Sequence, residues 1–160
     1  MSGHGEMRPP FRPTVRAVGG PPPLAPGETR KLLVRLARRL QVSQQTVDVL
    51  FAGDDLARRL NREHRGVDRS TDVLAFPSGA AGAGPAGCEE IPRHGLHMGD
   101  ILISSPTARR QAARRGHGPA HETRLLLIHG FLHLLGYDHE TDDGQMRELE
   151  RTLRWEVALR

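Results

Sequence analysis

The segment 125–139, LLLIHGFLHLLGYDH, constrains this chain more than any other. Its apolar residues surround the helical axis almost completely, so a helix over about 120–135 has to lie inside the molecule. His129 and His133 are four residues apart, which places both imidazoles on one face of that helix, one turn apart. A buried imidazole needs partners for both ring nitrogens. A shared metal ion would supply one partner to each ring.

A third ligand follows shortly after this helix. Gly136 predicts the end of the helix, because glycine reaches the positive φ that a sharp turn needs. The chain can then turn back and bring His139 to the same point. Three imidazole nitrogens leave a fourth tetrahedral position for water, which is typical of a catalytic zinc site and not of a closed structural one. The sequence therefore predicts a zinc site with His129, His133 and His139 as ligands.

The spacing His-x3-His-x2-Gly-x2-His coincides with the zinc-binding segment of the metzincin proteases. Those proteases carry their general-base glutamate directly after the first histidine, where this chain has Gly130. Peptidase activity is therefore only the second interpretation. Tyr137 and Asp138 can orient a ligand, whereas Asp138 can equally be a turn residue; the sequence leaves both readings open.

Composition bounds the class of protein without deciding its function. The 160 residues fit one domain, and the 23 basic residues, all but one of them arginine, give a net charge of +4. Arginine binds phosphate well, but a coding bias towards Gly, Pro, Ala and Arg would produce the same composition. The apolar runs are too short to cross a membrane, no secretory signal is visible, and the one cysteine, Cys88, has no intrachain disulfide partner. We therefore expect a cytoplasmic protein that does not bind membranes.

Hydrophobic periodicity predicts strands alternating with amphipathic helices. Residues 1–12 are expected to form a disordered leader rich in Pro and Gly, and 78–95 a long loop. The expected strands cover 14–18, at a sheet edge, and 46–52, 72–77 and 97–104. The expected helices cover 28–41, 55–65, 106–115, 120–135 and 142–159.

Three segments together resemble the YbeY family of metal-dependent endoribonucleases. HGFLHLLGYDH resembles its signature HGxLHLxGYDH, LNREHRGVDRSTDVLAFP is similar to its LNxxyRgxdxpTDVLSFP, and MGDILIS is similar to its LGDIxIS strand. The chain departs from the pattern at His64, where Tyr is common, at Ala75, where Ser is usual, and at Met98, where Leu is usual. None of these positions is an expected metal ligand.

The resemblance implies an α+β fold: a single small zincin-like domain over 13–160, with a mixed sheet of about four strands packed with about five helices. It implies one zinc ion per chain, held by His129, His133 and His139, and hydrolysis of single-stranded RNA in ribosomal RNA maturation and ribosome quality control. The expected partners are ribosomal RNA and the small ribosomal subunit, with no DNA. A ribosome-assembly factor with a purely structural metal is a further alternative.

The resemblance also selects Arg65, which matches an arginine that is functionally important in the family. A guanidinium near a bound metal ion would hold the scissile phosphate and offset the charge that develops on its oxygens. Arg65 is therefore the expected substrate-binding residue, and Arg65 and His129 are the expected catalytic residues. Asn61 and Thr71 are expected only to fix the loop between the helix 55–65 and the strand 72–77.

Overall fold

The computed structural model of the chain describes residues 11–78 and 97–158. Within these residues, four strands form one mixed sheet in the order β1-β2-β4-β3. The first three of these are parallel and β3 is antiparallel to β4. Each expected strand is present, and the one expected at an edge is an edge strand. The strands are β1 (Arg12–Ala17), β2 (Thr46–Ala52), β3 (Val73–Pro77) and β4 (His97–Ser104).

Five α-helices accompany the sheet in the described part of the chain, as expected. They are α1 (Pro26–Arg39), α2 (Asp54–Arg65), α3 (Ser105–Arg115), α4 (Pro119–Leu134) and α5 (Gln145–Leu153), the last continued by a π-helical turn over Arg154–Ala158.

The last helix begins three residues later than the expected start at 142. The Asp142 carboxylate accepts hydrogen bonds from the backbone N–H groups of Gly144 and Met146, at 2.8 and 2.9 Å. Gly144 has a φ of 91°, which is outside the helical region. Asp142 therefore belongs to the turn that precedes α5, and its side chain satisfies N–H groups at the helix start.

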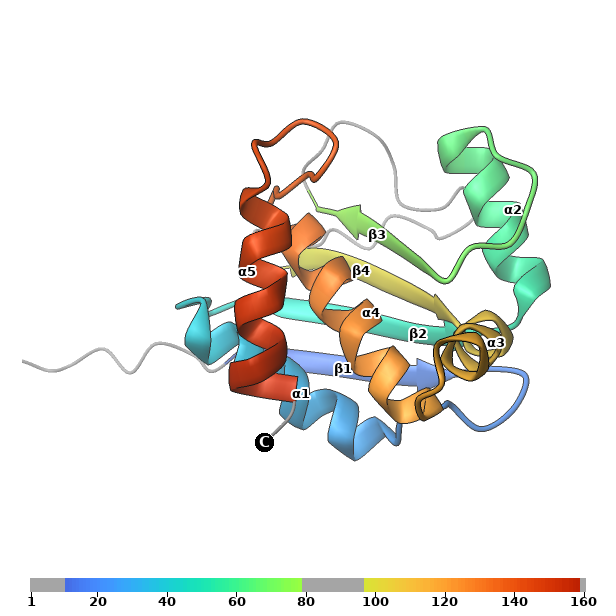
Figure 1. The fold of residues 1–160 in the computed structure, drawn as a ribbon, viewed down its shortest axis with the longest axis horizontal. Helices are drawn as coiled ribbons and strands as arrows, with labels where there is room; N and C mark the ends of the chain where they lie inside the picture. The colour runs from blue at the N-terminus through green and yellow to red at the C-terminus, as the bar shows by residue number, and fades with distance from the viewer. Residues whose placement is uncertain (1–10, 79–96, 159–160) are drawn as a thin grey trace, which may run out of the picture.

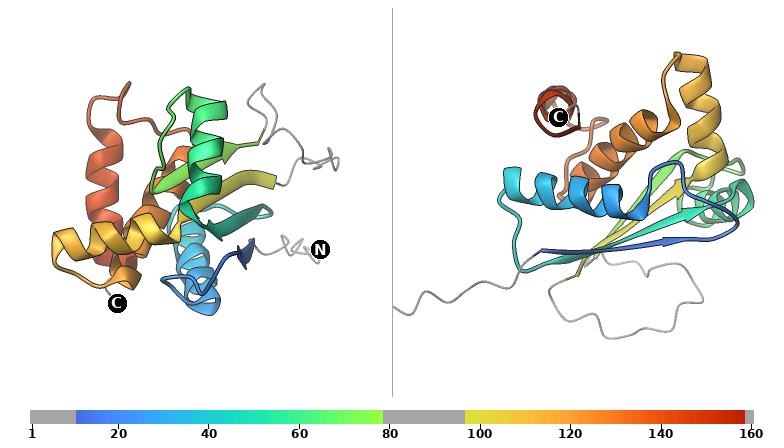
Figure 2. Two further views of the ribbon diagram at one scale, coloured as in Figure 1. Left: turned by 90° about the vertical axis from the view of Figure 1, so that its right-hand side faces the viewer. Right: turned by 90° about the horizontal axis from the view of Figure 1, so that it is seen from below.

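The helices form layers on the two faces of the sheet. The larger core contains side chains from α1, α3, α4 and α5 packed on β1, β2 and β4. A smaller apolar cluster joins α2 to the opposite face. Figure 1 shows α4 crossing the sheet beneath α5, and the right panel of Figure 2 shows α1 and α4 on one side of the sheet. The predicted class, a small α+β domain with one mixed sheet, is confirmed.

Helix α4 is buried, as its sequence predicts. It packs against β3, β4, α1, α3 and α5. Its side chains Leu127, Ile128, Phe131 and Leu132 are fully buried, and burial of each one stabilises the fold by about 1.5–3 kcal/mol. This packing holds α4 in one position and orientation relative to the sheet.

Two glycines allow α4 to approach the sheet closely. A Cβ on Gly130 would lie 3.0 Å from a methyl carbon of Ile101, and one on Gly99 would lie 2.7 Å from a methyl carbon of Leu134. Gly99 also has a φ of 144°, and its Cβ would lie 2.4 Å from the carbonyl oxygen of Phe76. The end of α4 can therefore lie directly on β3 and β4.

None of the helices in the described part of the chain is long and apolar enough to span a membrane. Most of the expected leader, 1–12, and most of the expected loop, 78–95, including Cys88, lie outside the described residues. β1 itself begins at Arg12.

Candidate active site

Three imidazoles meet at the C-terminal end of α4. His129 and His133 lie one turn apart on the helix, and their Nε2 atoms are 3.0 Å apart. Gly136, with a φ of 92°, turns the chain after α4 and brings His139 to a ring-centroid distance of 5.5 Å from His129 and 5.6 Å from His133. One ring nitrogen from each residue lies within 4.8 Å of the other two. We call these three residues the histidine triad.

The donor set of the triad fits a zinc ion. Burial lowers the pKa of His133, and the neighbouring His129 and His139 lower it further, because a second and third positive charge there would repel. His133 is therefore neutral at neutral pH, which is the form that binds metal. Three imidazole nitrogens with one side facing a cleft match the donor set of an open zinc site.

Glu150 of α5 orients the first histidine of the triad. Its Oε1 accepts a hydrogen bond from Nδ1 of His129 at 2.5 Å, and its side chain is only 14% exposed. Burial acts to raise the pKa of Glu150, but the hydrogen bond from His129 and the positive charges of His129, Arg154 and His139 together outweigh burial, and the pKa is lowered. A carboxylate that holds the proton on Nδ1 leaves the lone pair of Nε2 directed at the other two histidines.

Sequence reasoning missed Glu150. The signal available was weak: Glu150 is four residues after Met146 on α5, and Met146 is fully buried. A carboxylate one turn from a core residue on the same helix face points towards the core and needs a partner there.

Of the two readings left open for Asp138, its hydrogen bonds support the turn. Its side chain accepts the backbone N–H of Glu140 at 3.0 Å, and its carbonyl oxygen accepts that of Asp142 at 3.0 Å. Asp138 is therefore a turn residue. Tyr137 contributes through its backbone, which hydrogen-bonds to His133.

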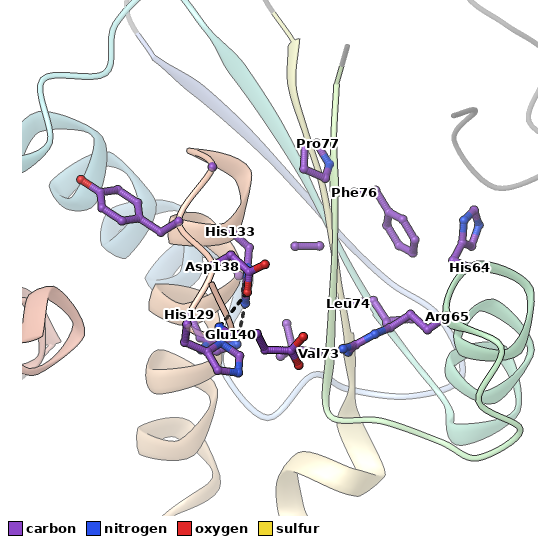
Figure 3. Close-up of a pocket in the computed structure, with 15 residues that line it drawn as sticks. His64, Arg65, Val73, Leu74, Phe76, Pro77, His129, His133, Asp138 and Glu140 are labelled. Atoms are coloured by element: carbon purple, nitrogen blue, oxygen red, sulfur yellow. Dashed lines mark hydrogen bonds between the residues drawn. The ribbon is translucent and has the colours of Figure 1, made fainter. Parts of the chain in front are cut away.

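A cleft of about 440 Å³ opens in front of the triad. Residues 73–77 of β3 line it, together with His64 and Arg65 from the last turn of α2. Figure 3 shows the Arg65 side chain reaching from α2 across β3 towards the side where His129 and Glu140 lie. Arg65 is exposed, and no described residue forms an ion pair or hydrogen bond with its guanidinium. The expected metal ligands and the expected phosphate-binding residue thus line one cleft.

The remaining candidate residues support the backbone. Asn61 donates a hydrogen bond to the carbonyl oxygen of Arg69 at 2.9 Å, so it fixes the loop after α2 as expected. Asp72 accepts hydrogen bonds from the Thr71 hydroxyl and from the backbone N–H of Val73. These contacts hold the start of β3 beside the cleft.

A second group of metal-binding residue types lies on β2 and β4, where Asp48, His97 and Asp100 approach one another. Here Nδ1 of His97 is 3.0 Å from the Thr46 hydroxyl and its Nε2 is 3.2 Å from an Asp100 oxygen. Both ring nitrogens already have partners within the protein. This histidine therefore needs no metal ion to satisfy its ring nitrogens.

A family model and several relatives of known sequence match this chain under the same description. The family model "Endoribonuclease YbeY" matches residues 27–157. Proteins named Endoribonuclease YbeY are similar to this chain: that of Solibacter usitatus is 43% identical over 133 residues, covering 81% of this chain and 79% of the relative. That of Shouchella clausii is 44% identical over 122 residues, covering 73% and 76%, and one from Helicobacter pylori is 38% identical over 128 residues, covering 80% and 83%.

The fold is also similar to a solved structure. The solution structure of TM1509 from Thermotoga maritima matches with a TM-score of 0.56 and 25% sequence identity, covering 92% of this chain and 88% of that one. The stretch matched by the family model contains Arg65, the histidine triad and Glu150. The chain belongs to the YbeY endoribonuclease family.

Proposed function

We propose that this endoribonuclease is a zinc-dependent enzyme that cuts single-stranded RNA during ribosomal RNA maturation and ribosome quality control, with the small ribosomal subunit as its partner. The observation that carries the proposal is the histidine triad, whose nitrogens lie within 4.8 Å of one another and face the cleft that also contains Arg65. Family membership supports RNA as the substrate.

In this proposal His129, His133 and His139 hold the zinc ion. A zinc ion bound there supplies a Lewis acid that polarises phosphate oxygens and lowers the pKa of water. Glu150 keeps the proton of His129 on Nδ1 through its 2.5 Å hydrogen bond. All three ligands are neutral donors, so the positive charge of the ion stays available to the substrate.

Arg65 binds and orients the scissile phosphate. Its guanidinium is always charged and can donate two parallel hydrogen bonds to phosphate oxygens. It lines the cleft and is not engaged by any described residue, so binding a phosphate breaks no ion pair within that part of the chain. As negative charge grows on the phosphate oxygens, the fixed positive charge stabilises the transition state.

Cleavage of single-stranded RNA by three variants, with zinc content measured in parallel, tests the proposal. Arg65→Ala should lower kcat about 10²–10³-fold, the usual cost of losing one preorganised charge-stabilising group, while zinc stays at one ion per chain. His133→Ala should lose both zinc and cleavage. Arg62→Ala is the matched control, because Arg62 is an exposed residue on the same turn that pairs with Asp68 at 3.7 Å. Equal cleavage by Arg65→Ala and Arg62→Ala would refute the role of Arg65.

The alternatives are separated by the same protein samples. A peptidase is disfavoured because Gly130 packs against Ile101, which leaves no side chain for the general base at that position. Release of peptides from casein without any RNA cleavage would reverse this ranking. A purely structural metal would leave RNA processing intact in a folded His129→Ala variant that still associates with the ribosome.

A further inference from the structure

A second hollow of about 390 Å³ lies between the loop after α2 and helix α3. Three arginines line it: Arg69 from the loop, and Arg110 and Arg114 from α3. We call it the arginine pocket. Asp72 lines this pocket and the next residue, Val73, lines the cleft. The two hollows therefore come to neighbouring residues of the chain, Asp72 and Val73, where β3 begins.

Two of these arginines have charges available to a ligand. Arg69 and Arg114 are exposed, and among the described residues neither guanidinium has an ion-pair or hydrogen-bond partner. Arg110 differs from them, because it donates to Asp54 Oδ2 at 2.8 Å and to the Thr107 hydroxyl at 2.9 Å. Arg110 therefore contributes to the wall of the pocket, while Arg69 and Arg114 supply its free positive charge.

Asp54 lies beside the pocket and has its own partners. Its Oδ1 accepts the hydroxyls of Ser104 at 2.6 Å, Thr107 at 2.7 Å and Ser70 at 3.0 Å. Burial acts to raise the pKa of Asp54, but these hydrogen bonds and that of Arg110 outweigh burial and lower it to about 2. The charged carboxylate thus ties the loop after α2 to the start of α3.

Asp72, the carboxylate inside the pocket, is similarly occupied. One oxygen accepts the backbone N–H of Val73 at 2.8 Å, and the other accepts the amide of Gln111 at 3.0 Å. Both of its oxygens accept from neutral donors, and neither forms an ion pair with Arg69 or Arg114. The guanidiniums of Arg69 and Arg114 therefore remain available to an anion, and with Arg110 they outnumber the one carboxylate that lines the pocket.

We propose that the arginine pocket binds a backbone phosphate of the RNA strand whose scissile phosphate lies at Arg65. This inference rests on the proposed function. Arginine matches the geometry of phosphate, and single-stranded RNA carries a phosphate at every nucleotide. An RNA strand that lies in the cleft and continues past the start of β3 would bring another phosphate to the arginine pocket. The arginine pocket extends the binding site beyond the reacting linkage.

Binding of a phosphorothioate-linked single-stranded RNA to the zinc-loaded, full-length protein provides the test. The variant is the double substitution Arg69→Ala/Arg114→Ala. The control is Arg30→Ala/Arg38→Ala, which removes the same charge from exposed positions on α1. For single strands, each lost phosphate contact reduces the slope of log K against log[salt] by about 0.7. The slope should therefore fall by about 0.7 in the pocket variant, for the one phosphate that is lost, and remain at the wild-type value in the control.

Cleavage kinetics on ordinary RNA provide a second readout. In the pocket variant KM should rise while kcat stays at the wild-type value, because the arginine pocket holds the strand away from the reacting bond. Retained secondary structure by circular dichroism checks the fold, which these exposed side chains do not support.

Each other outcome has a definite meaning. If wild type cleaves RNA and the pocket variant matches the control in slope and KM, the arginine pocket is not an RNA site and the proposed function stands. If inorganic phosphate binds to the wild type but not to the pocket variant, while both bind RNA equally, the arginine pocket is a site for the free anion. That result would overturn the proposal. Loss of small-subunit association with unchanged RNA binding would assign it to a protein partner. If wild type neither binds nor cleaves RNA, the proposed function fails and this inference fails with it.

Discussion

Glu150 determines which nitrogen of His129 faces the rest of the histidine triad. The hydrogen bond between Glu150 Oε1 and His129 Nδ1, at 2.5 Å, fixes both the tautomer and the rotation of the ring. Without it, the ring could bind a proton on Nε2 or rotate away from His133. In the proposed zinc site, the carboxylate would thus contribute to metal binding without touching the ion.

Glu150→Ala should lower the affinity for zinc about 10–100-fold, the usual effect of removing a carboxylate that orients a ligand. The measurement is a competition titration with a chromophoric chelator. Glu148→Ala serves as the control, because Glu148 lies on the same helix with a side chain that is 75% exposed. Equal zinc affinities for the two variants would show that Glu150 does not orient the ligand.

For single residues, the sequence predicts the candidate metal ligands better than it predicts the side chains that hydrogen-bond to them. His129, His133 and His139 are recognisable because helical spacing and one glycine bring them together locally. The pair of His129 and Glu150 is separated by 21 residues and forms only because α5 packs on α4. No local pattern encodes that distance, so the orienting carboxylate was found only in the structure.

Among the elements, β4 and α4 are coupled by the absence of a side chain at Gly99. The glycine lets the carbonyl of Phe76 and the side chain of Leu134 occupy the space where a Cβ would stand. Since Leu134 ends α4 and Phe76 lines the cleft, this contact sets the distance between the helix that carries His129 and His133 and the strand that lines the cleft.

Gly99→Ala should therefore lower the free energy of unfolding by at least about 2 kcal/mol, because backbone strain and overpacking each cost about 1–3 kcal/mol. Urea denaturation monitored by circular dichroism measures the change. Gly27→Ala, where an added Cβ meets nothing within 4 Å, should be unchanged or slightly more stable. A Gly99→Ala variant as stable as wild type would show that the contact is readily relieved.

Element positions followed from the sequence because periodicity is a local property. The strands and helices lie where apolar spacing predicts them, whereas the start of α5 moved because the Asp142 side chain bonds to Gly144 and Met146. The layer order, with α2 packed on the face opposite to α1 and α4, required tertiary contacts between segments distant in the chain.

For the whole molecule, the hydrophobic core is separate from the histidine triad. The core joins the sheet to α1, α3, α4 and α5, while His139 is exposed at the molecular surface. A fold that buries this core does not depend on the metal ion for its main source of stability.

We expect the metal-free protein to remain folded and cooperative. Free zinc at 100 times its dissociation constant should raise the free energy of unfolding by at most about 2.7 kcal/mol. Thermal unfolding with and without chelator measures this increment, and His133→Ala should abolish it without lowering the stability of the metal-free chain. A chain that unfolds when zinc is removed would instead show that the ion is structural.

The turn at Gly136, which brings His139 back to α4, has a consequence for the unfolded chain as well. All three ligands come from the segment 129–139, so in the denatured ensemble the imidazoles remain tethered by short loops at a high effective concentration. Zinc then retains some affinity for the unfolded protein, and any such binding reduces the stabilisation that the ion gives to the fold. If zinc at 100 times its dissociation constant raises the free energy of unfolding by less than about 2.7 kcal/mol, the shortfall measures how strongly the unfolded segment 129–139 binds zinc by itself.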